Sequence, residues 1–494
     1  MVRVSRFMLG FGLMAGLFGF VPAQAAILYV DKDNGCPGTG TSQAPYCRIQ
    51  NAFNAASAGD TIRIRDSATP YDESATATRS GTSGNPIIVE PDAGNNPTLR
   101  YTGNGAMAAV IQILGQDYWT VRNLTFDGTG VFTSQMAVWV ASGSTREQVG
   151  VQILNNTFKN WGGSEAQEDT SPNKPSALII SSGWDPPAGW PAPNGTVIRG
   201  NIFDGNRRKS IQLLSTRNTI VENNEIKNAT CGRDSDGAVN EIGIHVGTGS
   251  NHEHTGDTIR NNTIHDFAPW SACSLTSAPG TWSTMPGIWA DVGPTGGTVD
   301  GNRIWNLDQG NTGGVVLSVG VFIEYDCHDW TVKNNVIYNI GRAGFRHSPV
   351  TAGAVNRWFN NTVYNTGVHG MQLWYGNAVV KNNIFDNAGS SQIMATANAV
   401  SQGNLTINYN DYWDNAGGGK VGQWNGSTQK LADWKSTCNC DANSLNTDPL
   451  FAAPPLNFAL PPSSPLRGSG EGGVDMGVYA LSPPTNLRIL QVLP

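Results

Sequence analysis

The stretch that decides the fold, residues 320–337, reads GVFIEYDCHDWTVKNNVI. A short run of alternating side chains at 321–324 is followed by a polar turn, and a second short strand at 330–332 leads into the pair Asn334-Asn335. A third strand begins at Val336. Short apolar alternation bounded by polar turn residues is typical of β-strands with one buried face. We therefore interpret the stretch as one coil of three short strands.

The asparagine phrase of this coil recurs along most of the chain. The closest copies are 22 to 26 residues apart, and the longer intervals carry insertions. A repeat of this length with three short strands predicts a solenoid. Asparagine suits its turns because the residue tolerates left-handed backbone angles and bonds to its own backbone. The copies are Asn123-Leu124-Thr125-Phe126, Asn155-Asn156-Thr157-Phe158, Asn201-Ile202-Phe203, Asn223-Asn224-Glu225-Ile226, Asn261-Asn262-Thr263-Ile264, Asn302-Arg303-Ile304, Asn334-Asn335-Val336-Ile337, Asn360-Asn361-Thr362-Val363 and Asn382-Asn383-Ile384-Phe385.

These motifs resemble the right-handed parallel β-helix of the pectate-lyase-like superfamily, which has an asparagine ladder at the turn between the second and third strands. The resemblance covers residues 26–480. It implies an all-β solenoid of the polysaccharide lyase or glycoside hydrolase type, although such a fold does not name a reaction. A helical pattern at Ile49–Ala56 predicts a short helix that covers the open N-terminal end of the core. Residues 481–494 are interpreted as a C-terminal tail.

The first 25 residues predict export of the protein. Arg3 and Arg6 precede an apolar run at 7–21, and Ala23-Gln24-Ala25 resembles a cleavage site, so we interpret residues 1–25 as a signal peptide. We expect a secreted protein, extracellular or periplasmic, that is monomeric and has no membrane span. The net charge of −7 and the lack of a basic tract argue against nucleic acid as a partner.

Export permits disulfides, and the chain has seven cysteines. Because seven is odd, at least one is free or intermolecular. Cys36 and Cys47 flank an N-terminal turn and are a candidate pair. Cys438 and Cys440 are too close together to suggest an easy mutual bridge. Cys231 and Cys273 fall in consecutive insertions and are a candidate bridge.

Aligning the first strand of each coil places the outward side chains in columns, because side chains alternate across a strand. Apolar residues fix the inward phase, and they are Ile244, Ile288, Val321, Phe345 and Met371. The first outward column is Gln212, His245, Trp289, Phe322, Arg346 and Gln372, and the second is Leu214, Gly247, Asp291, Glu324, Ser348 and Trp374. Neighbouring coils are about 4.8 Å apart, so these columns form one surface that suits several sugar units.

A row of glycines runs beside these columns, and we expect it to let a sugar ring approach the backbone. Insertions at 228–240, 268–285 and 308–318 are expected to form walls beside this face. His347 points inward by phase, and a metal pair at His252 and His254 is a weaker alternative to a solvated loop. The glycines are Gly243, Gly287, Gly320, Gly344 and Gly370. The catalytic candidates are Arg346, His245, Asp291, Glu324 and Glu241, and the substrate-binding candidates are Trp289, Phe322, Gln372, Trp374, Arg342 and Arg208.

One mechanism that fits this face is β-elimination on an acidic, uronate-containing polysaccharide. Asp291, Glu324 and Arg346 fall on three successive coils, which resembles the placement of calcium ligands and arginine in calcium-dependent pectate lyases. The resemblance implies Ca²⁺ at Asp291 and Glu324, which offer hard oxygen ligands. The proline-containing arginine motif of that family is not evident here. His245 is an easier base at neutral pH than Arg346.

Glycoside hydrolysis is the alternative mechanism. Asp291 and Glu324 are one coil apart and offer the two carboxylates that such a reaction needs, and Glu241 is a third candidate. Carboxyl groups about 5 Å apart favour retention of configuration, whereas about 6.5–9.5 Å favours inversion. A further alternative, from a different class, is a non-catalytic glycan-binding surface protein, because aromatic platforms serve binding equally well.

Overall fold

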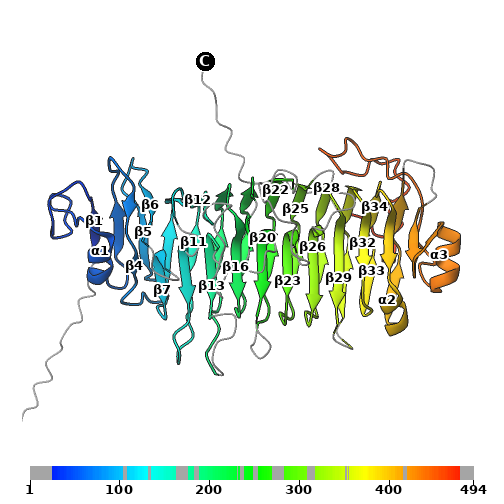
Figure 1. Ribbon diagram of the computed structural model, residues 1–494, viewed down its shortest axis with the longest axis horizontal. Helices are drawn as coiled ribbons and strands as arrows, with labels where there is room; N and C mark the ends of the chain where they lie inside the picture. The colour runs from blue at the N-terminus through cyan, green and yellow to red at the C-terminus, as the bar shows by residue number, and fades with distance from the viewer. Residues whose placement is uncertain are drawn as a thin grey trace, which may run out of the picture.

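The computed structural model describes residues 25–478 except 104–107, 132–134, 163–175, 183–188, 231, 234–238, 249–253, 270–282, 309–316, 351–352, 354 and 415–419. The expected signal peptide, the C-terminal tail and most of the predicted walls therefore lie outside the described residues. Within the described part, three long parallel sheets run along the whole molecule, and each coil contributes one strand to each sheet (Figure 1). This architecture is the predicted right-handed parallel β-helix.

The sheet that carries the aligned columns has 14 strands among the described residues. Its members are β4 (Ala75–Thr76), β7 (Ala109–Leu114), β10 (Met136–Ala141), β13 (Leu178–Ser181), β16 (Arg208–Leu214), β19 (Gly232–Arg233), β20 (Val239–Gly247), β23 (Thr284–Asp291), β26 (Leu317–Tyr325), β29 (Ala343–Pro349), β32 (His369–Leu373), β35 (Ser391–Ala395), β38 (Gly422–Trp424) and β39 (Ser427–Gln429). All pairings in it are parallel except those of β19 with β20 and β38 with β39. We call it the 14-stranded sheet.

Two further sheets complete each coil, with 13 and 12 strands among the described residues. The 13-stranded sheet comprises β1 (Ile27–Val30), β2 (Thr61–Ile64), β5 (Ile87–Pro91), β8 (Trp119–Arg122), β11 (Gln152–Leu154), β14 (Val197–Arg199), β17 (Ile220–Glu222), β21 (Thr258–Arg260), β24 (Thr298–Asp300), β27 (Thr331–Lys333), β30 (Asn356–Phe359), β33 (Ala378–Lys381) and β36 (Leu405–Asn408). The 12-stranded sheet comprises β3 (Tyr71–Asp72), β6 (Thr98–Arg100), β9 (Thr125–Asp127), β12 (Thr157–Lys159), β15 (Ile202–Asp204), β18 (Glu225–Lys227), β22 (Thr263–Phe267), β25 (Arg303–Leu307), β28 (Val336–Ile340), β31 (Thr362–Thr366), β34 (Ile384–Asp386) and β37 (Asp411–Trp413).

The predicted asparagine ladder lies at the turn between the 13-stranded and 12-stranded sheets. Oδ1 of Asn201 accepts hydrogen bonds from the backbone N–H and from Nδ2 of Asn156, at 2.9 and 3.1 Å. The same pair of bonds repeats from coil to coil as far as Asn410. The residue before each ladder asparagine is left-handed, as in Asn155 (φ 56°) and Gly200 (φ 69°). The ladder therefore satisfies buried polar groups that a turn inside the solenoid would otherwise leave unpaired.

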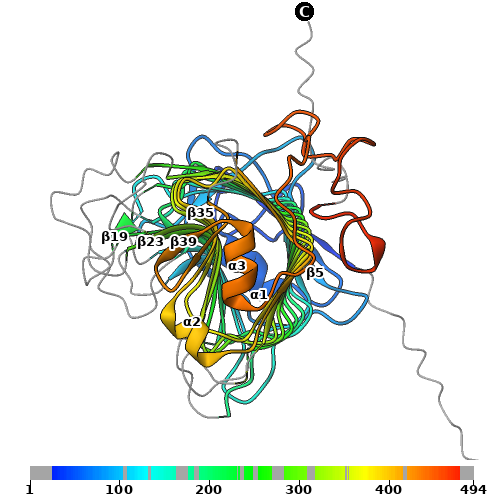
Figure 2. The same ribbon diagram turned by 90° about the vertical axis from the view of Figure 1, so that its right-hand side faces the viewer.

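Helices cover both ends of the core. The predicted N-terminal cap is α1 (Ile49–Ala55), which buries Ile49, Ala52 and Phe53. At the other end α3 (Leu431–Cys438) buries Trp434, a cap that the sequence pattern did not predict. Figure 2, viewed along the long axis, shows α1 and α3 over the middle of the superposed coils. A third helix, α2 (Ala397–Gln402), lies beside the last coils.

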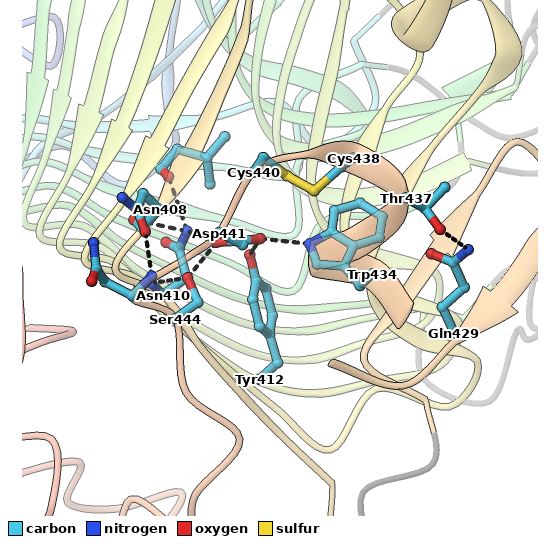
Figure 3. Close-up of a disulfide and its surroundings, with 12 residues drawn as sticks. Asn408, Asn410, Tyr412, Gln429, Trp434, Thr437, Cys438, Cys440, Asp441 and Ser444 are labelled. Atoms are coloured by element: carbon cyan, nitrogen blue, oxygen red, sulfur yellow. Dashed lines mark hydrogen bonds between the residues drawn. A yellow bond between two sulfur atoms is a disulfide. The ribbon is translucent and has the colours of Figure 1, made fainter. Parts of the chain in front are cut away.

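The cap around α3 is held by a buried carboxylate. Asp441 is 1% exposed and accepts hydrogen bonds from Trp434 Nε1 at 2.5 Å and from the Tyr412 hydroxyl at 2.8 Å. Figure 3 shows these bonds beside the disulfide between Cys438 and Cys440. The expectation that these two cysteines do not bridge is therefore wrong, because the left-handed Asn439 between them turns the chain back and brings their Cα atoms to 5.1 Å.

Three other cysteines lie among the described residues, and they are Cys36, Cys47 and Cys327. Cys36 and Cys47 form the predicted disulfide. Cys327 is the free cysteine among the described residues, and it is buried in the core. The candidate bridge between Cys231 and Cys273 lies outside the described residues.

After the last coil, residues 445–478 run back over the outer face of the 12-stranded sheet (Figure 1). We call this segment the strap, and it contains a short 3-10 turn (η2, Glu471–Gly473). Phe458 packs against Tyr338 of β28 and Tyr364 of β31, with ring centroids 5.6 Å apart in both pairs. Further along, Glu471 forms an ion pair with Lys381 at 2.7 Å. The strap thus ties three neighbouring coils together from outside. No helix among the described residues has the length and apolar character needed to cross a membrane.

Candidate functional site

The register of the 14-stranded sheet confirms the predicted columns. The inward residues Ile244, Ile288 and Val321 are paired across β20, β23 and β26 and are fully buried in the core. The outward residues continue in the same register, from His245 to Trp289. The first outward column is therefore Gln212, His245, Trp289, Phe322, Arg346 and Gln372, as aligned from the sequence.

The glycine row has a different role from the one expected. A Cβ at Gly320 would meet Ile337 Cγ2 of the 12-stranded sheet at 2.6 Å, and a Cβ at Gly344 would meet Val363 Cγ1 at 2.4 Å. These positions therefore face side chains inside the coil, and they do not form an open track for a sugar. The expectation is wrong because the strands bend at these glycines, which lets two sheets pack closely at their corner.

The first outward column forms a stack of planar side chains. The Trp289 and Phe322 rings are parallel within 3° at 5.9 Å, and His245 is 5.1 Å from Trp289. The Arg346 guanidinium lies 5.1 Å from the centre of the Phe322 ring and 4.4 Å from that of Trp374. Phe322 is 1% exposed, so its faces contact its neighbours. Trp289 and Trp374 are half-buried and remain available to a ligand.

Two carboxyl groups of neighbouring coils lie next to this stack. Asp291 ends β23 and Glu324 lies near the end of β26, one position beyond the register partners Ala290 and Ile323. Burial, followed by the negative charge of Asp291, raises the pKa of Glu324 to about 8, although the positive charge of Arg346 opposes the rise. Glu324 therefore retains its proton at neutral pH and can donate it.

His245 and Arg346 flank these carboxyl groups. His245 Nε2 lies 3.4 Å from Asp291 Oδ2, and its Nδ1 lies 3.3 Å from Gln212 Nε2. Both ring nitrogens thus have partners that fix the plane of the imidazole. Burial lowers the pKa of Arg346 to about 10, a shift that the charge of Glu324 opposes. The cluster of Asp291, Glu324, His245 and Arg346 can bind an anion and transfer protons.

Three other candidates lie away from this cluster. Arg208 and Glu241 are in register near the beginnings of β16 and β20, 2% and 0% exposed. Glu241 is six residues from Gly247, which corresponds to roughly 20 Å along the strand. Because both are buried so far from Asp291, we assign them to strand packing. Arg342 lies between the two regions, since its charge acts on Arg346 and also on His369.

Two further histidines, His347 and His254, are buried and contact groups outside the cluster. His347 is fully buried, Nε2 lies 2.9 Å from the Gly376 carbonyl, and burial lowers its pKa to about 4, so the inward placement is confirmed. His254 Nε2 lies 2.6 Å from Asp257 Oδ2 in a buried network with Thr216. The other member of the proposed metal pair, His252, lies outside the described residues.

Calcium is a poor fit to the residues of this cluster. Calcium takes about six to eight oxygen ligands, and the positive charge of Arg346, which acts on Glu324, would repel it. Among the residues described, no group of three or more His, Cys, Asp and Glu side chains has a metal-binding arrangement. We therefore route no chemical step through a metal.

The sequence reading missed Tyr325 and Tyr375. Tyr325 is 41% exposed, and its pKa is raised by burial and by the nearby charges of Glu324 and Asp291. Tyr375 acts electrostatically on both Tyr325 and Arg346, which places it beside the same cluster. Each tyrosine directly follows a residue of the second outward column, and that adjacency was the available signal.

Comparison with known proteins identifies the fold. A family profile described as "Right handed beta helix region" matches residues 109–281 and 192–378, together more than half of the chain. No curated protein sequence matches the chain. The crystal structure of GH136 lacto-N-biosidase from Eubacterium ramulus is 10% identical, covers 86% of this chain and 67% of its own, and has a TM-score of 0.51.

Weaker structural similarities extend to other functional classes. Pectate lyase Pel9A is 13% identical over 92% of this chain and 96% of its own, with a TM-score of 0.46. PfbA, a surface adhesin of Streptococcus pneumoniae, is 15% identical over 78% and 90%, with a TM-score of 0.48. These two similarities carry no argument, and the one to the lacto-N-biosidase, at 10% identity, concerns the fold alone.

Proposed function

The chain belongs to the right-handed β-helix family, and from that premise we propose that it is a secreted lyase that cleaves an acidic, uronate-containing polysaccharide. The observation that carries the proposal is the protonated Glu324 beside Arg346, with a histidine held by Asp291 on the adjacent coils. A proton donor, a cation and a base on one face are what β-elimination on a uronate requires.

The residues have separate roles in this reaction. Arg346 binds the uronate carboxylate and, by neutralising it, makes the C5 proton more acidic. His245, oriented by Asp291, removes that proton through Nδ1, once the substrate has displaced the Gln212 side chain that lies 3.3 Å from this nitrogen. The electrons of the C5–H bond form the C4–C5 double bond, the C4–O bond breaks, and Glu324 gives its proton to the leaving oxygen. Each proton and electron pair is thus accounted for by a side chain of the site.

We propose that the polysaccharide binds along the stack of planar side chains in the first outward column. Trp289, on the coil of Asp291, and Trp374, on the coil after Arg346, are half-buried and suit contact with sugar rings. The Trp374 indole N–H donates to Gln372 Oε1 at 3.4 Å, which orients the indole. Arg342 adds positive charge near Arg346 and favours an anionic substrate.

Glycoside hydrolysis is the second candidate, favoured by the electrostatic coupling of Asp291 and Glu324. Groups whose environments separate their pKa values serve as an acid and a base or nucleophile. Carboxyl groups about 5 Å apart would retain configuration, and groups about 6.5–9.5 Å apart would invert it.

The proposed location outside the cytoplasm has its own support. The disulfides Cys36–Cys47 and Cys438–Cys440 suit an oxidising compartment. The signal-like residues 1–25 agree with that location, and N-terminal sequencing of the exported protein would test it.

The decisive experiment incubates the purified protein with a panel of uronate polysaccharides, with and without a chelator. A rise in the ultraviolet absorbance of an unsaturated product is expected, and it should survive the chelator because no step uses a metal. Loss of the rise in chelator would instead support calcium at Asp291 and Glu324. New reducing ends without the absorbance would move the assignment to hydrolysis. Binding without either signal would indicate a non-catalytic glycan-binding protein.

A further inference from the structure

The outer face of the last coils, beneath the strap, holds two buried aspartates that the proposed reaction does not use. Asp386 ends β34 and Asp411 begins β37, and Ile384 of β34 is the register partner of Asp411. Phe385, directly before Asp386, and Tyr412, directly after Asp411, are register partners that point into the core, where they stack. Asp386 and Asp411 therefore share the outer face as diagonal neighbours, with Cβ atoms about 7–8 Å apart.

Both carboxyl groups are buried, and each has one oxygen without a hydrogen-bond partner among the described residues. Asp386 is 5% exposed and Asp411 is 0% exposed. Asp411 Oδ1 accepts a hydrogen bond from the Thr447 N–H of the strap at 3.1 Å, whereas its Oδ2 has no hydrogen-bond partner among the described residues. Asp386 Oδ1 has none either within that part of the chain. A buried carboxylate with open oxygens is costly unless a cation or a proton compensates it.

The charges around this pair are negative. Asp448 and Asp414 both act electrostatically on Asp386, and Asp386 and Asp448 act on Asp411. Arg346 acts on Glu324 as a counter-charge, whereas the side chains that act on Asp386 are all acidic. The site is thus built for a positive charge that the neighbouring side chains do not supply.

We propose that Asp386 and Asp411 bind a divalent cation, calcium by the chemistry of its ligands, and that this cation fastens the strap to the last coils. Calcium accepts carboxylate, backbone carbonyl and water oxygens in flexible geometry. No cluster of three acidic, His or Cys side chains suited to a metal occurs in the described ranges. Backbone oxygens of the strap and water would supply the remaining ligands.

Terbium luminescence tests the site directly in the full-length protein after removal of metals with EDTA. Tb³⁺ replaces Ca²⁺ at oxygen sites, and Tyr412 and Trp413 lie within reach as sensitisers. Wild-type protein should show sensitised emission that calcium displaces, and Asp386→Asn and Asp411→Asn should each lose it. Asp291→Asn serves as the matched control and should keep it. Absent emission in the wild type, or wild-type emission in D386N and D411N, would overturn the proposal, as would loss confined to D291N.

A second measurement follows the strap itself. Calcium should slow proteolytic cleavage within residues 445–478 and raise the melting temperature by a few degrees, because a ligand that binds only the folded state stabilises it. D386N and D411N should show neither response, and they should fold because each change is isosteric. An identical calcium response in D411N and the wild type would contradict a strap-fastening site.

Discussion

The outer faces of the 13-stranded and 14-stranded sheets carry charges at the same coil spacing but in a different order. On the 13-stranded sheet Glu222 lies between Arg199 and Arg260, with oxygen–nitrogen distances of 2.5 and 2.6 Å. On the 14-stranded sheet two carboxyl groups, Asp291 and Glu324, are neighbours and the cation Arg346 follows both. In the first order a carboxylate lies between two cations, whereas in the second order two carboxyl groups are neighbours.

The two orders of charge shift the pKa values of Glu222 and Glu324 in opposite directions. Burial tends to raise the pKa of Glu222, but hydrogen bonds and charges from Arg260 and Arg199 hold it below its usual value. The pKa of Glu324 is raised to about 8. The comparison teaches that the solenoid spaces its side chains uniformly, so that the sequence of charges along a column decides whether a face is structural or chemically active.

We call the outer face of the 13-stranded sheet the paired face and that of the 14-stranded sheet, where the reaction is proposed, the active face. The largest expected effect comes from removing the proton donor Glu324 from the active face. Glu324→Gln should lower kcat by roughly 10²–10⁴-fold, because the leaving oxygen loses its proton donor. Initial rates on the polysaccharide that the wild type cleaves would measure it. The matched control on the paired face, Glu222→Gln, should keep wild-type rates. Equal losses in the two variants would break the comparison.

Removal of the cation should have the next largest effect. Arg346→Ala is expected to lower kcat/KM by about 10²-fold or more, because the uronate carboxylate loses its partner, while circular dichroism stays unchanged. Arg260→Ala on the paired face should leave kcat/KM as it is. Turnover at the wild-type rate in R346A would show that Arg346 takes no part in the reaction.

The pH profile should report the raised pKa of Glu324. Activity is expected to fall above about pH 8, up to tenfold per pH unit, because the acid form of Glu324 disappears. Measured kcat between pH 6 and about 10 gives the alkaline limb. A limb that survives in E222Q supports the assignment to the active face. A flat profile through this range would exclude Glu324 as the acid.

The smallest effect, and the sharpest comparison, concerns stability. The folded pKa of Glu324 lies above its usual value, so this group costs stability progressively as pH rises from about 4.5 to about 8. E324Q should therefore be more stable than the wild type at pH 9, by about 2 kcal/mol. Glu222 has a lowered pKa, so its contribution is present at neutral pH and is lost in acid; E222Q should be destabilised at neutral pH by about 1 kcal/mol. Melting curves measured across pH should show a stability change of E324Q at pH 9 that is opposite in sign to that of E222Q at neutral pH. Changes of the same sign would contradict the comparison.

Features that rest on local chemistry were predictable from the sequence. The alternation around Val321 and the asparagine pairs give strands and turns of fixed period, so the coil, the ladder and the columns follow. The helical spacing at Ile49–Ala56 gave the N-terminal cap in the same way. With the register fixed, Asp291, Glu324 and Arg346 had to meet on one face.

Features that depend on distant partners were not predictable. The glycine row faces inward because of side chains such as Ile337 in another sheet, and no local pattern at Gly320 reveals this. The contact of Phe458 with Tyr338 joins segments far apart in the chain, so the strap could not be placed. The charge state of Glu324 depends on how deeply it is buried, a quantity that its column position does not supply.

The asparagine ladder has a consequence for how the molecule can change in length. Each rung presents the same donors to one neighbour and the same acceptor to the other, at 2.9 Å from Asn201 to Asn224 and at 3.0 Å from Asn361 to Asn383. A duplicated coil would find the same bonds above and below it and would need no new end cap. The molecule is in this sense modular, and each added module would lengthen the outer face by about 4.8 Å without disturbing the residues already there.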